Sequence, residues 1–316
     1  MTLRNLFFIA CSLFFVHCTV SVAANNAEPS RQKGYNAAVA YADGFVVAGT
    51  EGKIDRLSRS GAVVKSEKFA GVEFNALVVH DQTIVAAGEM GALLISSNNG
   101  EFKPIDSGTD KTIHSLAFFS DKIIGGTDQG EIVAETGNGT FHKIPLALKG
   151  NIVSLSANVS ECYGVTDAGE IIRSKDGIQW TITDFNTQYA GYYKPCVFTR
   201  VLAVDGRIAI AGKRNDGSPV LFFSTQGNVW TDRILDYTND ERQMNSPTEI
   251  LNDIYYYYPE DLYFLACNNG IMMQIPSCSH CNKLIPIGTD DLRCMAFNGN
   301  VLLFAGSNYS IKAVDM

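Results

Sequence analysis

A glycine recurs every 39 residues along the first half of this chain, at Gly52, Gly91, Gly130 and Gly169. Each one ends a similar short stretch, such as Ala48-Gly49-Thr50-Glu51-Gly52. A fixed period near 40, built from short apolar runs, is typical of repeat architectures, in which each unit packs only against its neighbours. The period therefore constrains the fold more strongly than any single motif does.

The second period shows what one unit contains. Its apolar runs are Phe74–His80, Thr83–Gly88, Ala92–Ser96 and Phe102–Ile105, separated by turn residues. These runs are rich in Val, Ile, Phe and Ala, and none is long enough to favour a helix. Four-stranded units of about 40 residues are the blades of β-propellers. We therefore predict an all-β fold.

Seven such units can be counted from the end of each second strand. The intervals between these positions are 39, 39, 39, 46, 55 and 39 residues, so units five and six carry insertions. The positions are Ala48, Ala87, Gly126, Val165, Ala211, Ala266 and Ala305. We predict a seven-bladed β-propeller of four-stranded antiparallel blades as one domain over residues 25–316, with six or eight blades as alternatives. The seventh unit has three runs, and Asn25–Gly34 is the candidate for its fourth strand.

The N-terminus has the pattern of a secretory signal peptide. Arg4 precedes an apolar run from Leu6 to Val22, and small residues follow up to Ala24. We predict a signal peptide over residues 1–24, cleaved between Ala24 and Asn25, and a secreted or periplasmic protein with no membrane span afterwards. A membrane anchor is the competing interpretation. A lipid anchor at Cys18 is disfavoured because His17 occupies a position that requires a small residue.

Charge and motifs exclude several function classes. The net charge of −8, without a Lys/Arg cluster, argues against nucleic-acid binding. We find no nucleophile elbow, phosphate-binding loop or His-rich metal set, so we expect no cofactor and no metal. A monomeric binding protein is favoured over an enzyme.

One turn carries a more specific pattern. Ser174-Lys175-Asp176-Gly177-Ile178-Gln179-Trp180 resembles the Asp-box (BNR-type) turn of sialidase-like β-propellers, and Ser224–Trp230 is a degenerate copy with Gln226 in the aspartate position. The resemblance implies a structural role for Asp176. It is nearer to non-catalytic members, such as photosystem II assembly-factor-like propellers, because the arginine set of the sialidases cannot be mapped. Arg200, Arg242 and Arg293 are the only candidates for that set.

The repeat also superposes positions near the start of the innermost strands. Counting 12 residues back from each second-strand position gives a set that is mostly polar within apolar runs. The set is Asn36, Asn75, His114, Val153, Thr199, Ile254 and Arg293, with Asn252 as the alternative to Ile254. Polar residues there need hydrogen-bond partners. Channel water is one explanation, and a ligand site with Arg293 as anion anchor and His114 as hydrogen-bond partner is the other.

Two long connections are the candidate binding loops. Thr183–Lys194 contains Tyr189, Tyr192 and Tyr193, and Asp236–Thr248 contains Tyr237 and Arg242. Long loops on a rigid scaffold tend to be functional, and we expect these two to rise over the channel. The alternative is that their aromatic side chains fold inwards and plug the ring.

Six cysteines follow the predicted cleavage site. Their places in neighbouring units predict disulfides between Cys162 and Cys196 and between Cys267 and Cys294, with a local pair Cys278–Cys281.

Taken together, these patterns predict an exported propeller that acts as a binding or assembly module for a protein or a glycan. The alternative is a carbohydrate-active protein, either a lectin or a glycoside hydrolase using acids such as Asp240, Glu241 or Glu249.

Overall fold

The computed structural model describes residues 32–136, 139–239, 242–277 and 282–316. The predicted signal peptide with its cleavage site, and Cys18, lie outside these residues. So do the predicted Cys278–Cys281 pair and the acids Asp240 and Glu241. None of the helices in the described part of the chain is long and apolar enough to cross a membrane.

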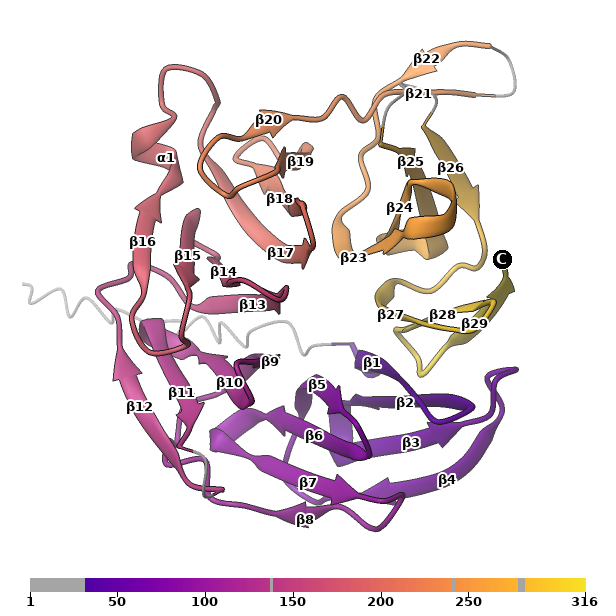
Figure 1. The fold of residues 1–316 in the computed structure, drawn as a ribbon. Coiled ribbons are helices and arrows are strands. Elements are labelled where there is room, and N and C mark those ends of the chain that lie inside the picture. Colours follow the sequence, from indigo (N-terminus) through magenta and orange to yellow (C-terminus); the bar gives the residue numbers. More distant parts are fainter. Residues whose placement is uncertain (1–31, 137–138, 240–241, 278–281) are drawn as a thin grey trace, which may run out of the picture. The chain divides into compact units, whose positions relative to one another are not determined.

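Seven antiparallel sheets stand around a common axis, which confirms the predicted seven-bladed propeller (Figure 1). In each blade the strands follow one another in sequence from the axis outwards. Blade one contains β1 (Tyr35–Tyr41), β2 (Gly44–Gly49), β3 (Lys53–Leu57) and β4 (Val63–Lys68), and blade two contains β5 (Phe74–His80), β6 (Thr83–Gly88), β7 (Leu93–Ser97) and β8 (Lys103–Pro104). Blade three contains β9 (Ile113–Phe119), β10 (Lys122–Thr127), β11 (Glu131–Glu135) and β12 (Phe141–Pro145). Blade four contains β13 (Ile152–Ala157), β14 (Cys162–Thr166), β15 (Glu170–Ser174) and β16 (Thr181–Asp184).

The last three blades follow two insertions, one before blade five and one before blade six. Blade five contains β17 (Cys196–Val204), β18 (Arg207–Arg214), β19 (Pro219–Ser224) and β20 (Thr231–Asp232). Blade six contains β23 (Leu251–Tyr257), β24 (Leu262–Cys267), β25 (Ile271–Pro276) and β26 (Lys283–Pro286), and blade seven contains β27 (Leu292–Asn298), β28 (Val301–Gly306) and β29 (Ile311–Asp315). Helix α1 (Phe185–Gln188) precedes blade five, and the hairpin β21 (Tyr237–Thr238) and β22 (Met244–Asn245) precedes blade six.

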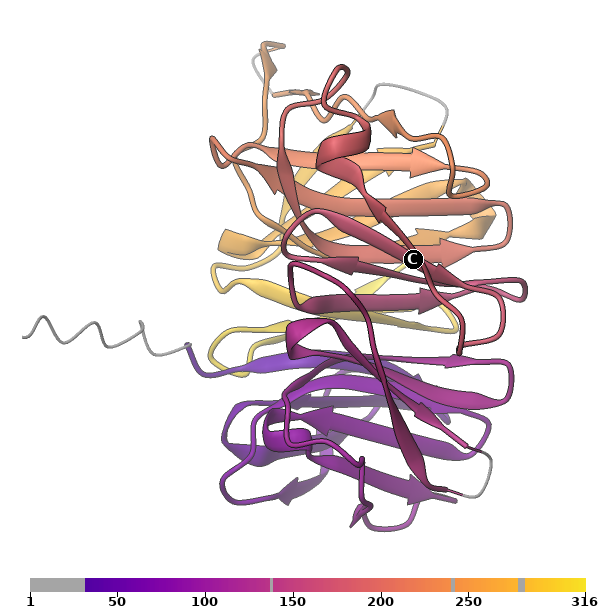
Figure 2. The ribbon, with the colours of Figure 1, turned by 90° about the vertical axis from the view of Figure 1, so that its left-hand side faces the viewer.

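The two faces of the ring differ in the connections that they carry. Because every blade is an antiparallel meander, all seven inner strands begin on the same side, which we call the start face. The turns from first to second strand and from third to fourth strand lie on the opposite side, which we call the turn face. Figure 2 shows the ring edge-on, with the described chain beginning at the start face.

The hydrophobic core is divided among the interfaces between blades. The described residues form seven buried clusters, and each cluster draws its side chains from two adjacent blades. The second strands lie between two such clusters, so β2 and β28 are buried along their whole length. Burial on both sides explains why these strands are continuous apolar runs that do not alternate with polar residues. Trp180 and Trp230 also pack into these interfaces.

The recurring glycine has a geometric cause. In the turn Thr50–Gly52 between β2 and β3, Glu51 has φ 57° and Gly52 has φ 68°. Two consecutive residues with positive φ form the hairpin turn that matches strand twist, and glycine adopts this region without steric cost. A Cβ on Gly52 would lie 1.6 Å from the carbonyl oxygen of Phe69, so this position also lacks space for a side chain.

The turn at Ser174–Trp180 is held by side-chain hydrogen bonds. The Asp176 carboxylate accepts the backbone N–H groups of Ile178 and Gln179, both at 2.8 Å, and Ser174 Oγ accepts the N–H of Gly177 at 2.8 Å. The N–H groups of Gln179 and Ile178 hold the pKa of Asp176 below its usual value. Asp176 therefore has a structural role in this hairpin.

Blade seven has three strands in the described part of the chain. Gly34 forms an antiparallel bridge with Ser307, and the N–H of Asn308 donates to the carbonyl of Lys33 at 2.7 Å. Residues 25–31, most of the predicted fourth strand, lie outside the described residues. The junction between the first and last blades is completed by their own cluster around Tyr35, Phe45 and Leu303.

The two predicted disulfides that fall within the described residues are not formed in this structure. Cys162, Cys196, Cys267 and Cys294 are all free and buried. The members of each predicted pair, Cys162–Cys196 and Cys267–Cys294, belong to different hydrophobic clusters and so face different interfaces between blades. Neighbouring positions in the repeat did not translate into facing sulfur atoms.

We predict that Gly52→Ala lowers the free energy of unfolding by about 3 kcal/mol or more, because the methyl group adds a clash with Phe69 to the strain of positive φ. Gly71→Ala is the matched control, since Gly71 has φ 77° but no atom within 4 Å of the added Cβ. It should cost about 1 kcal/mol. Urea unfolding followed by tryptophan fluorescence measures both, and equal losses would contradict the steric explanation.

The four free thiols generate a second prediction. Burial raises the pKa of Cys162 to about 12 and that of Cys196 to about 11, and it raises the pKa of Cys267 and Cys294 as well. Iodoacetamide should leave all four unmodified in the folded protein and alkylate all four after unfolding without reductant. Peptide mass mapping at each position is the measurement. A pair that resists alkylation until reductant is added would be a disulfide.

Candidate functional site

Every innermost strand carries a β-bulge at the same level of the ring. At this residue the first strand gains one position relative to the second, so that two inner residues face one partner. The bulged residues are Asn36, Asn75, His114, Val153, Thr199, Asn252 and Arg293. This is the set predicted from the repeat, with Asn252 in blade six in place of Ile254.

Four of the bulged side chains bond to the next blade. Three of them donate to the backbone carbonyl that precedes the next bulge: Asn36 to Phe74 at 2.9 Å, Thr199 to Leu251 at 2.8 Å and Asn252 to Leu292 at 2.8 Å. At the junction of the last and first blades, Arg293 donates to Asn36 Oδ1 at 3.1 Å and to the carbonyl of Gln32 at 2.6 Å. A bulge thus supplies a side chain that reaches across the blade interface.

The residue after the bulge completes the pattern as an acceptor. Its side-chain oxygen accepts a backbone N–H from the inner strand of the next blade. The pairs are Ser115 with Leu155 at 2.7 Å, Ser154 with Val201 at 3.1 Å and Asp253 with Met295 at 2.9 Å. The edge of each inner strand that faces the axis has no neighbouring strand, and these hydrogen bonds give some of its backbone N–H groups an acceptor.

Hydrogen bonds between blades therefore explain why polar residues occupy several of the bulge positions. Ligand binding by Asn36, Asn75, His114, Thr199 and Arg293 stays a prediction. Residues of all seven inner strands do enclose a cavity of about 380 Å³ on the axis. Its charged groups include the ion pair between Arg200 Nε and Asp253 Oδ1 at 2.9 Å, and burial raises the pKa of Asp253. His114 Nε2 lies 2.5 Å from Asp128 Oδ1.

The first candidate loop is largely folded onto blade five. The hydroxyls of Tyr189 and Tyr193 donate to the carbonyls of Asn228 and Trp230, at 2.9 and 2.8 Å. Their rings pack on Phe185 at the edge of the cluster between blades four and five. Tyr192 is 82% exposed. Two of these three tyrosines are thus packed at the interface of blades four and five, and they do not line the cavity on the axis.

The second candidate loop extends outwards from the ring. Figures 1 and 2 both show the β21–β22 hairpin at the outer rim, beside blade six, and not above the axis. Tyr237 is bridged to Asn282, whose amide donates to the carbonyls of Ile234 and Asp236, each at 2.9 Å. Arg242 is exposed near the tip of this hairpin. The expectation that both loops rise over the channel is therefore wrong in its geometry.

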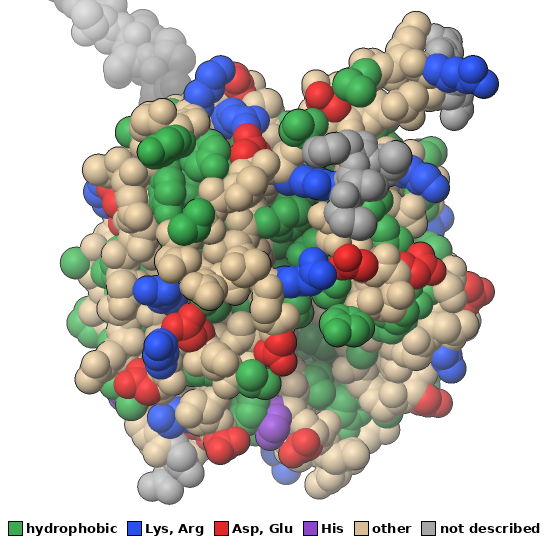
Figure 3. All heavy atoms as spheres, turned by 45° about the horizontal axis from the view of Figure 1, so that its top comes forward, with side chains coloured by type: hydrophobic (Ala, Val, Ile, Leu, Met, Phe, Trp, Pro, Cys, Tyr) green, Lys and Arg blue, Asp and Glu red, His purple; other side chains and the backbone are tan. Residues whose placement is uncertain are grey.

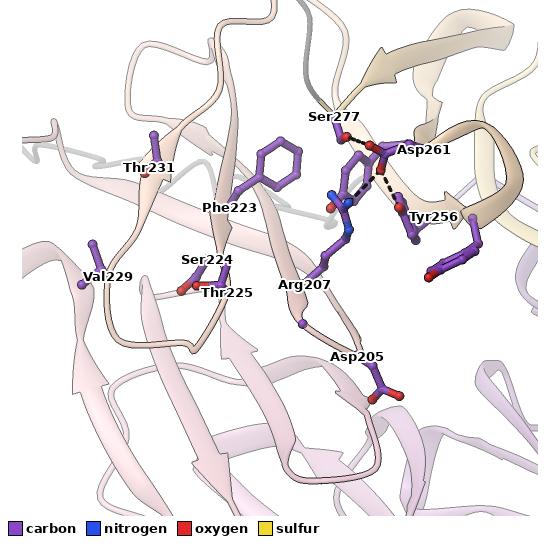
Figure 4. A pocket seen from close by; sticks show the side chains of 13 residues that line it. Asp205, Arg207, Phe223, Ser224, Thr225, Val229, Thr231, Tyr256, Asp261 and Ser277 are labelled. Atoms are coloured by element: carbon purple, nitrogen blue, oxygen red, sulfur yellow. Dashed lines mark hydrogen bonds and ion pairs between the residues drawn. The ribbon is translucent and has the colours of Figure 1, made fainter.

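A pocket of about 780 Å³ opens on the turn face between blades five and six, and the sequence did not indicate it (Figure 4). We call it the blade 5–6 pocket. Within it Arg207 forms an ion pair with Asp261 at 2.9 Å. The Asp261 carboxylate also accepts hydrogen bonds from the hydroxyl groups of Tyr256 and Ser277. The Arg207 guanidinium lies 4.9 Å from the centre of the Tyr256 ring.

Hydrophobic and aromatic side chains surround this polar centre. Phe223 and Tyr263 stack at 4.6 Å, while Tyr258 is 81% and Val229 is 68% exposed. Asp205 also lines a second hollow of about 660 Å³ that continues along the turn ends of blades three to five, beside the 84% exposed Val159. Figure 3 shows this face hollowed near its middle, with hydrophobic side chains in the hollow.

One signal could have pointed to the blade 5–6 pocket. That signal is the run of four tyrosines at Tyr255–Tyr258, none of which is among the predicted binding residues. Tyr256 is buried, and Tyr255 and Tyr257 pack against the cluster between blades six and seven. Tyr258 is the exception because the strand ends before it.

Groups suited to metal binding are not present in the described part of the chain. No cluster of three or more His, Cys, Asp or Glu side chains is close enough there to hold an ion. Glu249, one of the candidate catalytic acids, accepts the N–H of Thr248 at 2.9 Å in the loop before β23.

Comparisons with known proteins agree on the architecture. Neither a protein-family model nor a curated protein sequence matches the chain. Among solved structures it is similar to YCF48 bound to D1 peptide (TM-score 0.68, 12% identity, covering 90% of this chain and 94% of that one) and to the WD40 β-propeller domain of Doa1 (0.66, 11%, 89% and 92%). It is also similar to the computationally designed protein Ika8 (0.60, 11%, 90% and 97%). At these identities the likeness establishes the fold alone.

We predict that Ser154→Ala destabilises the protein by about 1–3 kcal/mol, because the N–H of Val201 loses its acceptor in a buried place. Hydrogen exchange, read by mass spectrometry, should accelerate in the peptide that contains Val201. Ser97→Ala, at an exposed serine, is the control and should change neither quantity. Unchanged exchange at Val201 would show that the bond between blades contributes nothing.

Proposed function

We propose that this protein is a binding or assembly module whose protein partner docks on the turn face, centred on the blade 5–6 pocket. The observation that carries the proposal is the gathering of exposed hydrophobic side chains around the two connected hollows, with Tyr258, Val229 and Val159 as the most prominent. Exposed apolar groups around a polar-centred cavity are a feature of protein-binding surfaces.

The start face offers a poorer site for a partner. Side chains predicted there to bind a ligand, such as Asn36, form hydrogen bonds with the neighbouring blade. The aromatic loop residues Tyr189 and Tyr193 are packed, and their hydroxyls donate to backbone carbonyls of blade five. Withdrawing them from these contacts would cost the ring part of its own stability. The turn face can bind without such a rearrangement.

One comparison supports a protein ligand as the class. The YCF48 propeller was solved with a D1 peptide bound, and its fold covers almost this entire chain. A propeller of this size can therefore serve as a peptide-binding platform. Fold alone does not carry function, so the choice of surface rests on the residues described above.

The sequence carries two further parts of the proposal. We propose export through cleavage between Ala24 and Asn25, based on the pattern of residues 1–24. We also propose kinship with the Asp-box propellers, supported by the capping geometry of Asp176 in its turn.

A glycan is the second candidate ligand. The exposed ring of Tyr258 beside the Arg207–Asp261 pair combines an aromatic platform with hydrogen-bonding groups. Glycan-array binding that is lost in Tyr258→Ala, with no protein partner detected by the experiment below, would favour this alternative.

Site-specific photo-crosslinking tests the protein-binding proposal. We expect a photoreactive phenylalanine at position 258 to crosslink a defined partner in the cells that produce the protein, while the same group at Met90, which is exposed in the second-to-third-strand turn of blade two on the start face, does not. Val229→Asp should reduce the crosslink at position 258 by about tenfold, since it places a charge in the apolar rim. Ile182→Asp, on an exposed strand residue of blade four, is the matched control. Crosslinking at Met90 alone would contradict the turn-face assignment.

A further inference from the structure

Asp205 occupies a distinctive place on the turn face. It lies in the turn between β17 and β18, is exposed, and lines both the blade 5–6 pocket and the second hollow. Within the described part of the chain its carboxylate has no hydrogen bond or ion pair. An unpaired carboxylate is therefore available at the junction of the two cavities.

The nearby arginine does not serve as its counterion. In Figure 4 the Arg207 guanidinium points towards Asp261 and away from Asp205. Asp261 is engaged by Arg207, Tyr256 and Ser277, and the Ser277 hydroxyl is the main cause that holds its pKa below the usual value. Arg207 and Asp261 neutralise each other, which leaves the negative charge of Asp205 uncompensated in the lining.

The walls of the pocket also suit a cation. Tyr256, Tyr258, Tyr263 and Phe223 line it, and aromatic faces attract cationic groups. The Tyr256 ring already carries the Arg207 guanidinium at 4.9 Å, whereas Tyr258 presents an exposed ring. The chain's net charge of −8 would further favour the approach of a basic partner.

We propose that the docked partner contributes an extended segment with a Lys or Arg side chain whose charged group pairs with Asp205. Its aliphatic stem lies against Tyr258, the residues on one side of it cross the pocket towards Val229, and the rest of the segment follows the second hollow past Val159. This inference rests on the proposed turn-face function and specifies the chemistry of the partner.

Selection from a random peptide library provides the test. Phage-displayed random peptides of about twelve residues would be panned on the mature chain, and the selected peptides measured by fluorescence anisotropy against wild type and variants. We expect the selected set to be enriched in Lys and Arg beside apolar residues. Asp205→Asn should weaken their binding by about fivefold, and the difference from wild type should shrink as salt screens the pair.

Asp43→Asn is the matched control, because Asp43 is exposed in the equivalent first-to-second-strand turn of blade one and is not part of the pocket. It should bind like wild type. Peptides that are acidic or uncharged but still lose binding in Tyr258→Ala would overturn the basic-segment inference and keep the turn-face function. If no peptide is selected, or if binding is unchanged by Tyr258→Ala and Val229→Asp, both proposals are wrong.

Discussion

The burial of hydrophobic side chains between adjacent blades is the interaction on which the whole molecule depends. A single four-stranded sheet of this composition has two apolar faces, and each face is covered only when a neighbouring blade lies against it. The number of blades, the closure of the ring and the buried second strands follow from this requirement. So does the weak alternation of the second strands, because both of their faces are interior.

Closure of the ring creates a second requirement, at the axis. Each inner strand presents, on its axial edge, backbone groups that have no strand to pair with. The bulges meet this need in part, because they turn a side chain towards the next blade, as Asn36 and Asn252 show. Polar residues that interrupt an apolar strand are therefore explained by the joining of blades, and their presence alone does not indicate a ligand.

The fold could be predicted from the repeat, but the candidate site could not. The spacing of Gly52 and its counterparts encodes a turn with positive φ, and that local requirement is repeated often enough to fix the blade length. The bulge positions followed by counting, and blade six differed because its first turn holds extra residues, which moved the equivalent position from Ile254 to Asn252. The blade 5–6 pocket combines Asp205 and Arg207 with Tyr258 and Asp261 from the next blade's turn, and no spacing in the sequence records that contact. Loop length likewise indicated an insertion but not the outward direction of the β21–β22 hairpin.

Within the described residues the last blade has three strands, and this gives the ring one interface unlike the others. The first and last blades meet there, and no loop among the described residues links them. Each other pair of adjacent blades is tethered covalently, so a blade that separates is returned by its own connection. The Tyr35–Tyr309 ring contact at 5.1 Å and the Gly34–Ser307 bridge hold the untethered interface by non-covalent contacts. Thermal opening of the circle should consequently begin at this gap, and a circular permutant cut between two other blades would move the weak point to the new termini.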